Sequence, residues 1–265
     1  MTLGGAALVF TRSRVTILPT SPTLRIIEKE RPLETVFILV EPARAENVGA
    51  AARALKTMGF AQLWLVNACP LQPEAYWVAH ESAEILDQAQ HFPDLASALE
   101  TIDFSIATGA RRRLEKNDYL SPQECVQALS GKSQSVARAA LVFGRESSGL
   151  TGEEMALCDA ATTIPLAVTQ PSLNLAQAVM LYAWELSAAR ATPNKHFNAT
   201  HISSNSEVNR TTYGAASDQL DHLLTTLHVQ RNDNAYQWAL ELLARSDDRD
   251  LGLLMMLLRR IGERL

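Results

Sequence analysis

The chain has 265 residues, of which 47% are hydrophobic and 20% charged, and its formal net charge is −5. This composition excludes a disordered or collagen-like chain and allows one main domain with additional elements. The three cysteines are far apart and odd in number, which argues against a zinc ribbon and against a secreted disulfide framework.

The N-terminal region carries no membrane or export signal that we can identify. No apolar run approaches the roughly 18 residues of a membrane span, and the apolar run at residues 4–10 is not preceded by the positive charge of a signal peptide. We therefore expect a cytoplasmic protein that does not contact a membrane. Residues 1–33, punctuated by Thr, Ser and Pro, form an N-terminal arm to which we assign no structure.

Residues 34–190 alternate short β-branched runs with helical patterns, which predicts an α/β domain of parallel strands joined by crossover helices. Strands are expected at residues 36–40, 62–66, 103–108, 139–143 and 161–165. Helices are expected at residues 47–58, 75–90, 93–100, 122–129, 151–158 and 173–190. Residues 191–215 have linker composition, and leucines at helical spacing in residues 216–265 predict a small helical extension.

The predicted helix at residues 173–190 is apolar nearly all round. One stripe contains Tyr182, and Trp184 lies on the remaining surface. Such a helix must be buried on two sides. One side can pack on the sheet, and a second copy of the chain is the simplest occupant of the other, so we predict a homodimer. We expect Trp64, Trp77 and Trp184 in apolar cores.

Three polar islands interrupt this apolar scaffold, at Asn47–Arg53, Gly144–Leu150 and Ser172–Val179. The second island directly follows a predicted strand and precedes a helix, which is where α/β proteins hold small ligands. Taken alone, it is also compatible with a surface turn. The three islands together indicate an active site.

Single residues in the islands have both functional and structural interpretations. Arg53 is a candidate ligand contact, but a structural pair with Glu41 or Glu46 explains it as well. Ser172 is placed to cap the last helix. Asn174, one turn into an apolar helix, needs a hydrogen-bond partner if it is buried, which makes it the better site candidate.

Several common sites are absent from the sequence. It contains neither the phosphate loop GxxxxGK[ST] nor GxGxxG, and it lacks the G-x-S-x-G elbow of hydrolases. The six histidines form no HxxxH pair, so we expect no metal.

Together the islands resemble the SPOUT superfamily of RNA methyltransferases, in its TrmH/TrmJ-like branch that methylates ribose 2′-hydroxyls. The matching motifs are NxGxxxR from Asn47, GRExxGL from Gly144 and SLNLAxAV from Ser172. The resemblance covers about residues 35–190, and the tail from Ser217 is similar to the TrmJ extension. It implies a parallel sheet flanked by helices with a C-terminal trefoil knot, which general folding rules would exclude, and a bent S-adenosylmethionine held in that knot.

The resemblance also implies functional residues. The catalytic residues that it implies are Asn47, Arg53, Glu146, Ser172 and Asn174. The cofactor-binding residues that it implies are Thr108, Gly109, Ala110, Gly144, Ile164, Pro171, Ser172 and Leu173. Because a guanidinium stays protonated above about pH 12, we favour a role for Arg53 in orienting the ribose hydroxyl and a neighbouring phosphate.

RNA is the implied partner, although the acidic balance of the chain departs from more basic members of the family. The expected RNA contacts are Arg53, Arg111, Arg112, Arg113, Lys116 and Arg145, with Arg12 and Arg14 as further candidates. The alternative for the arginine cluster is a solvated loop. The lead-in at residues 169–171 also departs from the family pattern, which leaves the substrate contacts there open.

The resemblance implies methylation of a tRNA ribose in the anticodon loop, of the cytidine/uridine 32 type. Two alternatives stay open: methylation of ribosomal RNA, and a non-catalytic module that binds S-adenosylmethionine and RNA or dimerises. The presence of Asn47, Arg53, Glu146 and Asn174 together argues against the non-catalytic module.

Overall fold

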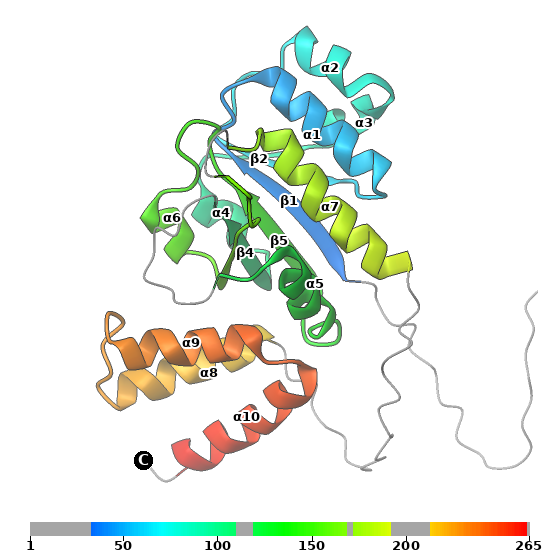
Figure 1. Cartoon of the computed structure of the whole chain (residues 1–265). Helices are drawn as coiled ribbons and strands as arrows, with labels where there is room; N and C mark the ends of the chain where they lie inside the picture. The colour runs from blue at the N-terminus through cyan, green and yellow to red at the C-terminus, as the bar shows by residue number, and fades with distance from the viewer. Residues whose placement is uncertain (1–32, 110–118, 169–171, 192–212, 264–265) are drawn as a thin grey trace, which may run out of the picture. The chain divides into compact units, whose positions relative to one another are not determined.

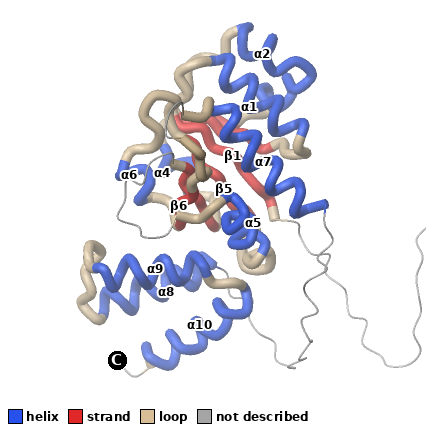
Figure 2. The backbone as a smooth tube through the Cα atoms, in the orientation of Figure 1, coloured by secondary structure: helices blue, strands red, loops and turns tan. Residues whose placement is uncertain are grey.

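The structure is a computed structural model that describes residues 33–109, 119–168, 172–191 and 213–263. Its strands form one parallel sheet in the order β3-β2-β1-β5-β4-β6 (Figures 1 and 2). The strands are β1 (Glu34–Val40), β2 (Gln62–Val66), β3 (Gln90–Phe92), β4 (Phe104–Thr108), β5 (Arg138–Phe143) and β6 (Ala160–Thr162). The predicted parallel sheet is therefore confirmed.

Helices cover both faces of this sheet. The helices are α1 (Ala45–Thr57), α2 (Pro73–Ala79), η1 (His80–Ser82), α3 (Ala83–Asp87), α4 (Leu95–Leu99), α5 (Pro122–Ser130), α6 (Gly152–Ala156), α7 (Leu175–Ala191), α8 (Tyr213–Thr226), α9 (Asn234–Arg245) and α10 (Asp248–Gly262). Helices α1 and α7 lie side by side on one face, and α4 and α6 lie on the other (Figure 1). The connection from β6 to α7 includes residues 169–171, which lie outside the described residues, so the trefoil knot stays a prediction.

The central strand β1 explains why the sequence predicts a sheet covered on both sides. All side chains of Val36–Val40 are at most 1% exposed. Phe37 and Leu39 pack with the α1 and α7 side of the core, whereas Val36 and Ile38 pack with the α4 and α6 side. A strand with two covered faces needs apolar residues at consecutive positions, and not at alternate ones.

The helix predicted at residues 75–90 is wrong as a single element. The chain forms α2, a 3-10 turn and α3, and the break lies at His80, whose φ is +54°. Residues 90–92 then pair with β2 as the edge strand β3, which the sequence analysis missed. An edge strand of three half-exposed or exposed residues shows neither an apolar run nor a clear alternation, which explains the omission.

Helix α7 is apolar all round, as predicted, but only part of its surface is buried in the protomer. Tyr182 is 1% exposed and faces the core, whereas Leu181 is 39% and Trp184 is 54% exposed. The prediction of a core position is confirmed for Trp64, at 2% exposure, and is wrong within the protomer for Trp184 and for Trp77, which is 72% exposed.

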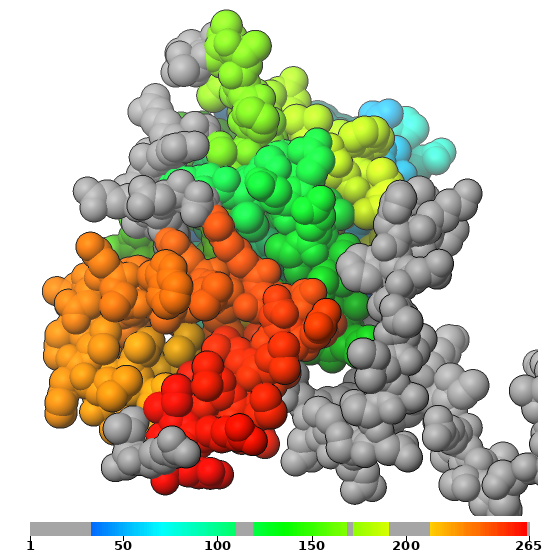
Figure 3. All heavy atoms as spheres, turned by 60° about the horizontal axis from the view of Figure 1, so that its bottom comes forward, coloured from blue at the N-terminus to red at the C-terminus, as the bar shows by residue number. Residues whose placement is uncertain are grey.

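The helical extension, α8 to α10, packs against the sheet domain through the ring contact of Tyr213 with Phe104 and through polar contacts around a buried lysine. Its first helix begins at Tyr213, two residues before the end of the predicted linker. Lys132 is 0% exposed, donates to the Ser246 carbonyl and lies 5.0 Å from the ring centroid of Phe104. The Asp248 carboxylate accepts from two backbone N–H groups that follow Lys132 in the chain. Figure 3 shows atoms of the extension against those of α5.

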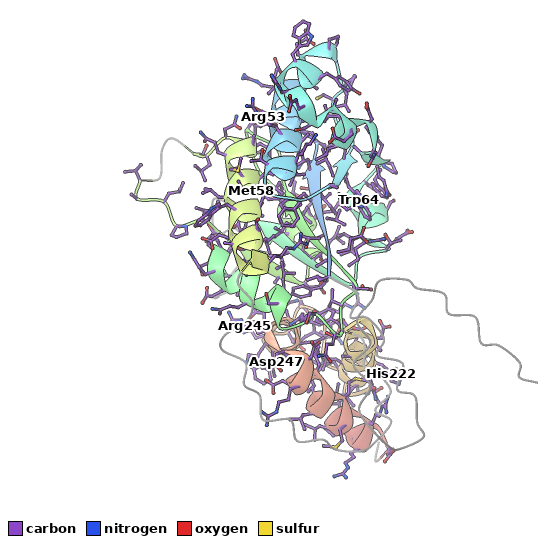
Figure 4. All side chains as sticks on the ribbon, turned by 90° about the vertical axis from the view of Figure 1, so that its right-hand side faces the viewer. Arg53, Met58, Trp64, His222, Arg245 and Asp247 are labelled. Atoms are coloured by element: carbon purple, nitrogen blue, oxygen red, sulfur yellow. The ribbon has the colours of Figure 1, made fainter. Side chains whose placement is uncertain are left out.

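A cavity of about 320 Å³ lies where the extension meets α5. Its lining includes Gln127 of α5, Arg245 at the end of α9 and Asp247 before α10, and Figure 4 labels the last two. The cavity is separate from the three polar islands, because none of its lining residues belongs to them.

Candidate active site

The three polar islands meet in one chain of hydrogen bonds. Asn174 Nδ2 donates to Asn47 Oδ1 at 2.9 Å, and Asn47 Nδ2 donates to Glu146 Oε1 at 2.7 Å. The islands come together because β1 and β5 are parallel neighbours, so the segments that follow them start from the same edge of the sheet. Asn47 lies in the first turn of α1, after β1, and Glu146 lies in the loop after β5.

The Glu146 carboxylate holds the start of α1. Its Oε2 atom accepts from the backbone N–H of Ala43 at 2.9 Å, whereas Arg44, the N-cap residue of α1, makes no side-chain cap hydrogen bond. Burial raises the pKa of Glu146, but the hydrogen bonds from Ala43 and Asn47 outweigh it and lower the pKa below its ordinary value. Glu146 is therefore an ionised group that fixes the position of Asn47.

Asn174, and not Ser172, caps helix α7. Its Oδ1 atom accepts from the Ala176 N–H at 2.8 Å, and Gln177 Oε1 accepts from the Asn174 N–H at 3.0 Å. The expectation of a Ser172 cap is wrong because α7 begins at Leu175, so the capping position falls on the residue before it. Both Ser172 and Asn174 are exposed, which also corrects the expectation of an amide buried one turn into the helix.

Arg145 is held by two carboxylates of the protein. Its Nε atom lies 2.7 Å from Glu41 Oε2, and its two terminal nitrogens each lie 2.9 Å from an oxygen of Glu154. The hydrogen bonds from Arg145 and Asn67 lower the pKa of Glu41. Because its donors are directed at Glu41 and Glu154, Arg145 links the loop after β5 to the end of β1 and to α6, and the expectation of a ligand contact by Arg145 stays a prediction.

The loop after β5 folds back on itself at Gly144. A Cβ atom added there would lie 2.2 Å from backbone atoms of both Gly149 and Leu150. The resemblance attributes this glycine to the approach of the cofactor. The structure gives another sufficient reason, since any side chain would collide with the backbone of the same loop.

Arg53 is exposed on α1, and among the described residues no carboxylate pairs with it (Figure 4). The structural alternative, a pair with Glu41 or Glu46, is not found: Glu41 pairs with Arg145, and no ion pair joins Arg53 to either carboxylate, both of which the structure describes. Gly49, which shares a helical face with Arg53, is buried, and an added Cβ would lie 2.0 Å from the Ala75 carbonyl oxygen. The small residues of α1 therefore allow α2 to pack closely.

Four of the expected cofactor residues lie at or shortly after the carboxyl ends of β4, β5 and β6, namely Thr108, Gly109, Gly144 and Ile164. Thr108 Oγ1 donates to the Val142 carbonyl at 3.0 Å, and the Gly109 N–H donates to the Thr162 carbonyl at 3.0 Å. Ile164 follows β6 and is half-buried. Gly144, Ser172 and Leu173 complete the described part of this set, while Ala110 and Pro171 lie outside the described residues.

The chemistry of this edge fits an adenosine group. The described residues of the set are small, apolar or neutral, and none would repel a positively charged sulfonium. The same segment after β6 carries Leu166 and Val168, which are 40% and 62% exposed. Exposed apolar side chains beside strand ends are suited to covering an aromatic base.

Two further expectations concern charged groups. Arg111, Arg112, Arg113 and Lys116, and with them the N-terminal Arg12 and Arg14, lie outside the described residues. Among the residues that the structure does describe, no group of three His, Cys, Asp or Glu side chains could hold a metal ion. In the same part of the chain, no helix has the length and apolarity needed to cross a bilayer.

Sequence reasoning missed two contributors to the site. Glu41 was considered only as a partner of Arg53, and the backbone N–H of Ala43 was not considered at all. The signal available in the sequence was position, because both residues lie in the short segment between the buried strand β1 and helix α1. Their partners, Arg145 and Glu146, lie more than 100 residues away, which no local pattern reveals.

Comparison with known proteins agrees with this geometry. The model of the SpoU rRNA methylase family matches residues 34–184. The chain is 43% identical over 230 residues to LasT of Escherichia coli (strain K12), named an uncharacterized tRNA/rRNA methyltransferase, and the match covers 86% of this chain and 97% of LasT. It is 38% identical over 156 residues to the tRNA (cytidine/uridine-2′-O-)-methyltransferase TrmJ of Pectobacterium atrosepticum, covering 58% of this chain and 64% of TrmJ.

Solved structures show the same fold. A probable methylase family protein from Haemophilus influenzae Rd KW20 has a TM-score of 0.62 at 28% identity, covering 88% of this chain and 97% of that one. TrmJ from Z. mobilis ZM4 has a TM-score of 0.55 at 26% identity, covering 86% and 98%. The fold is that of SPOUT methyltransferases, as the motifs implied. The chain belongs to the SpoU rRNA methylase family and is an RNA methyltransferase whose methyl donor is S-adenosylmethionine.

Proposed function

We propose that this enzyme methylates a ribose 2′-hydroxyl of tRNA in the anticodon loop, at a cytidine or uridine of the position-32 type. The relatives named TrmJ support this substrate, since their name states cytidine/uridine 2′-O-methylation of tRNA. The observation that carries the proposal is the hydrogen-bond chain from Asn174 through Asn47 to Glu146, which unites all three motifs of ribose methyltransferases.

S-adenosylmethionine supplies an activated methyl group on a sulfonium. We assign its binding to the edge of the sheet formed by the segments after β4, β5 and β6, with the cofactor residues given above. A trefoil knot at this edge, as the resemblance implies, would fix these segments relative to one another. Holding nucleophile and methyl group in line is worth up to about 7–11 kcal/mol of the barrier.

We assign two kinds of role to the candidate site residues. The side-chain oxygen of Asn47 accepts from Asn174, and its amide nitrogen donates to Glu146. We therefore assign Asn47 and Glu146 as positioning residues. Within the part of the chain that the structure describes, Arg53 has no such partner, and we assign its exposed guanidinium to orienting the ribose hydroxyl and a neighbouring phosphate. Ser172 and Asn174, exposed beside the start of α7, complete the surface that receives the ribose.

We assign the RNA contacts to basic side chains, because these attract the negatively charged phosphates of RNA. Arg111, Arg112, Arg113 and Lys116 form the main basic segment of an otherwise acidic chain, and Arg53 adds a charge beside the site. If about four phosphates are neutralised, the logarithm of RNA affinity falls with that of salt concentration with a slope of roughly −3 to −4.

We also propose a homodimer that forms through α7. Leu181 and Trp184 expose apolar surface on a helix whose opposite side is fully buried. Covering this surface with a second copy removes it from water. A tRNA substrate places the enzyme in the cytoplasm.

Ribosomal RNA is the alternative substrate, because the matching family is described by rRNA and the LasT relatives by tRNA/rRNA. A non-catalytic module is the other alternative. The complete hydrogen-bond chain and Arg53, which has no carboxylate partner among the described residues, argue against it, since a binding module has no need for a positioned ribose site.

Labelled S-adenosylmethionine, incubated with the enzyme and with unmodified tRNA or unmodified ribosomal RNA, tests the proposal. We expect label in a 2′-O-methylated pyrimidine nucleoside of the tRNA, mapped to the anticodon loop. Label only in ribosomal RNA would select the alternative substrate. Cofactor binding in calorimetry without transfer to any RNA would select the non-catalytic module.

A further inference from the structure

Basic side chains in the described part of residues 33–191 are almost all engaged by the fold. Arg138 pairs with Glu34, Arg145 with Glu41 and Glu154, Lys56 with Glu84, Arg190 donates to Thr35 and lies over the Phe60 ring, and Lys132 is buried. The exceptions are Arg44 and Arg53, which are exposed and have no carboxylate partner among the described residues. Both belong to the start or the body of α1.

Arg44 is the N-cap residue of α1 and lies next to the hydrogen-bond chain. Its carbonyl oxygen accepts from the Asn47 N–H at 3.1 Å, and the preceding residue, Ala43, donates to Glu146. The backbone around Arg44 is thus fixed by the backbone N–H of Asn47 and by the Glu146 carboxylate, two residues of the candidate site. Its side chain makes no cap hydrogen bond to α1. A rigid backbone therefore presents a guanidinium whose donors are not used by the described protein.

An arginine without a carboxylate partner among the described residues is unexpected in this acidic chain. The protein carries five more acidic than basic side chains, and Glu46 and Glu146 lie close to Arg44 in the chain or in space. The guanidinium nevertheless pairs with neither. An exposed arginine that bypasses nearby carboxylates keeps its planar donor set for an external anion, and phosphate is the group that this geometry matches best.

We infer that Arg44 binds a backbone phosphate of the substrate RNA next to the target ribose. This inference rests on the proposed function, since it takes RNA as the substrate of the site. Arg44 and Arg53 are nine residues apart, and at the rise of an α-helix their Cα atoms are separated by about 13 Å along α1. The two guanidinium groups therefore contact different phosphates, with Asn47 between them.

The test is the salt dependence of binding to an unmodified tRNA transcript. For Arg44→Gln we expect the slope of log affinity against log salt to shrink by about 1, with affinity at low salt about five- to tenfold weaker. Because Arg44 does not touch the reacting atoms, KM for tRNA rises, while kcat at saturating tRNA and the affinity for S-adenosylmethionine stay at wild-type values. Arg44→Lys retains a charge and restores the slope.

Arg249→Gln is the matched control, because Arg249 is also exposed and without a described partner but lies on α10. Its slope is expected to equal that of the wild type. A wild-type slope in Arg44→Gln, an equal loss in Arg249→Gln, or a wild type that binds no RNA would each overturn the inference. A wild type that binds tRNA with the full slope but transfers no methyl group would instead sink the proposed function.

Discussion

The amide of Asn174 donates a hydrogen bond to the side-chain oxygen of Asn47, 127 residues earlier in the chain, at 2.9 Å. The Asn47 amide in turn donates a hydrogen bond to Glu146. The cap of α7, the first turn of α1 and the loop after β5 therefore form one polar unit. Each side chain in the unit orients the next. The activity is therefore expected to depend on residues that never touch the substrate.

Asn47→Ala removes the central member of this unit. It leaves the partly buried Glu146 carboxylate without its side-chain donor, and losing a hydrogen bond to a charged group costs about 1.5–3 kcal/mol. We expect a free energy of unfolding lower by that amount in urea titration and a severe loss of kcat, with unchanged cofactor affinity. Asn232→Ala, in an exposed loop of the extension, is the control. Wild-type kcat in Asn47→Ala would show that the unit is dispensable.

Arg53→Ala is expected to abolish methyl transfer while leaving cofactor affinity nearly intact. The reason is that Arg53 is exposed and unpaired among the described residues, so its removal disturbs no contact of the fold. Single-turnover assays and calorimetry measure the two properties separately. Loss of cofactor binding instead would place Arg53 in the cofactor site, and a lower melting temperature would reveal a structural role.

Gly49→Ala tests the close packing of α2 on α1. The new Cβ would lie 2.0 Å from the Ala75 carbonyl oxygen, a backbone atom that cannot rotate away. We expect destabilisation of about 1–3 kcal/mol from overpacking. Gly252→Ala, on α10, meets nothing within 4 Å and is expected to stabilise by up to about 1 kcal/mol through helix propensity. Equal effects of the two substitutions would refute the packing argument.

Lys132 gives a pH dependence with a defined sign. Burial lowers its pKa to about 8, against the opposing effect of Asp248, Asp247 and Asp159. Between about pH 8 and its ordinary pKa of 10.5, the folded protein then binds fewer protons than the unfolded chain, so the contribution of Lys132 to stability rises with pH.

The comparison that isolates this effect is the wild type against Lys132→Met, in urea titrations between pH 8 and pH 9.5. We expect the difference in unfolding free energy to move in favour of the wild type by at most about 1.4 kcal/mol per pH unit. The extension of the variant should also become more accessible to protease, because the Ser246 carbonyl loses its donor. A pH-independent difference would mean that Lys132 is charged to the same extent in both states.

Trp184→Glu tests the proposed dimer through α7. A charge on this 54% exposed position cannot be covered by an apolar partner surface, so we expect a monomer in light scattering. Trp238→Glu, at a 64% exposed position on α9, is the control and should leave the oligomeric state of the wild type unchanged. A wild type that is monomeric at micromolar concentration would contradict the proposal.

The sequence determined the elements with strong local signals. The apolar run at Val36–Val40 and the motif directly after β5 are readable because covered strands and glycine loops leave contiguous patterns. The same motifs predicted Asn47, Glu146 and Asn174 as site residues, and the structure brings these three side chains together. The short edge strand β3 could not be predicted from the local sequence, because its three residues show no clear apolar pattern.

Only the tertiary structure decided how these residues are paired. It directs Arg145 to Glu41 and Glu154, gives the cap of α7 to Asn174, and leaves Arg44 and Arg53 free of described carboxylates. The physical reason is the separation in sequence over which each kind of interaction acts. Strand and helix signals arise between residues a few positions apart, whereas the partner of a charged side chain is chosen by distance in space, after strands far apart in sequence have become neighbours.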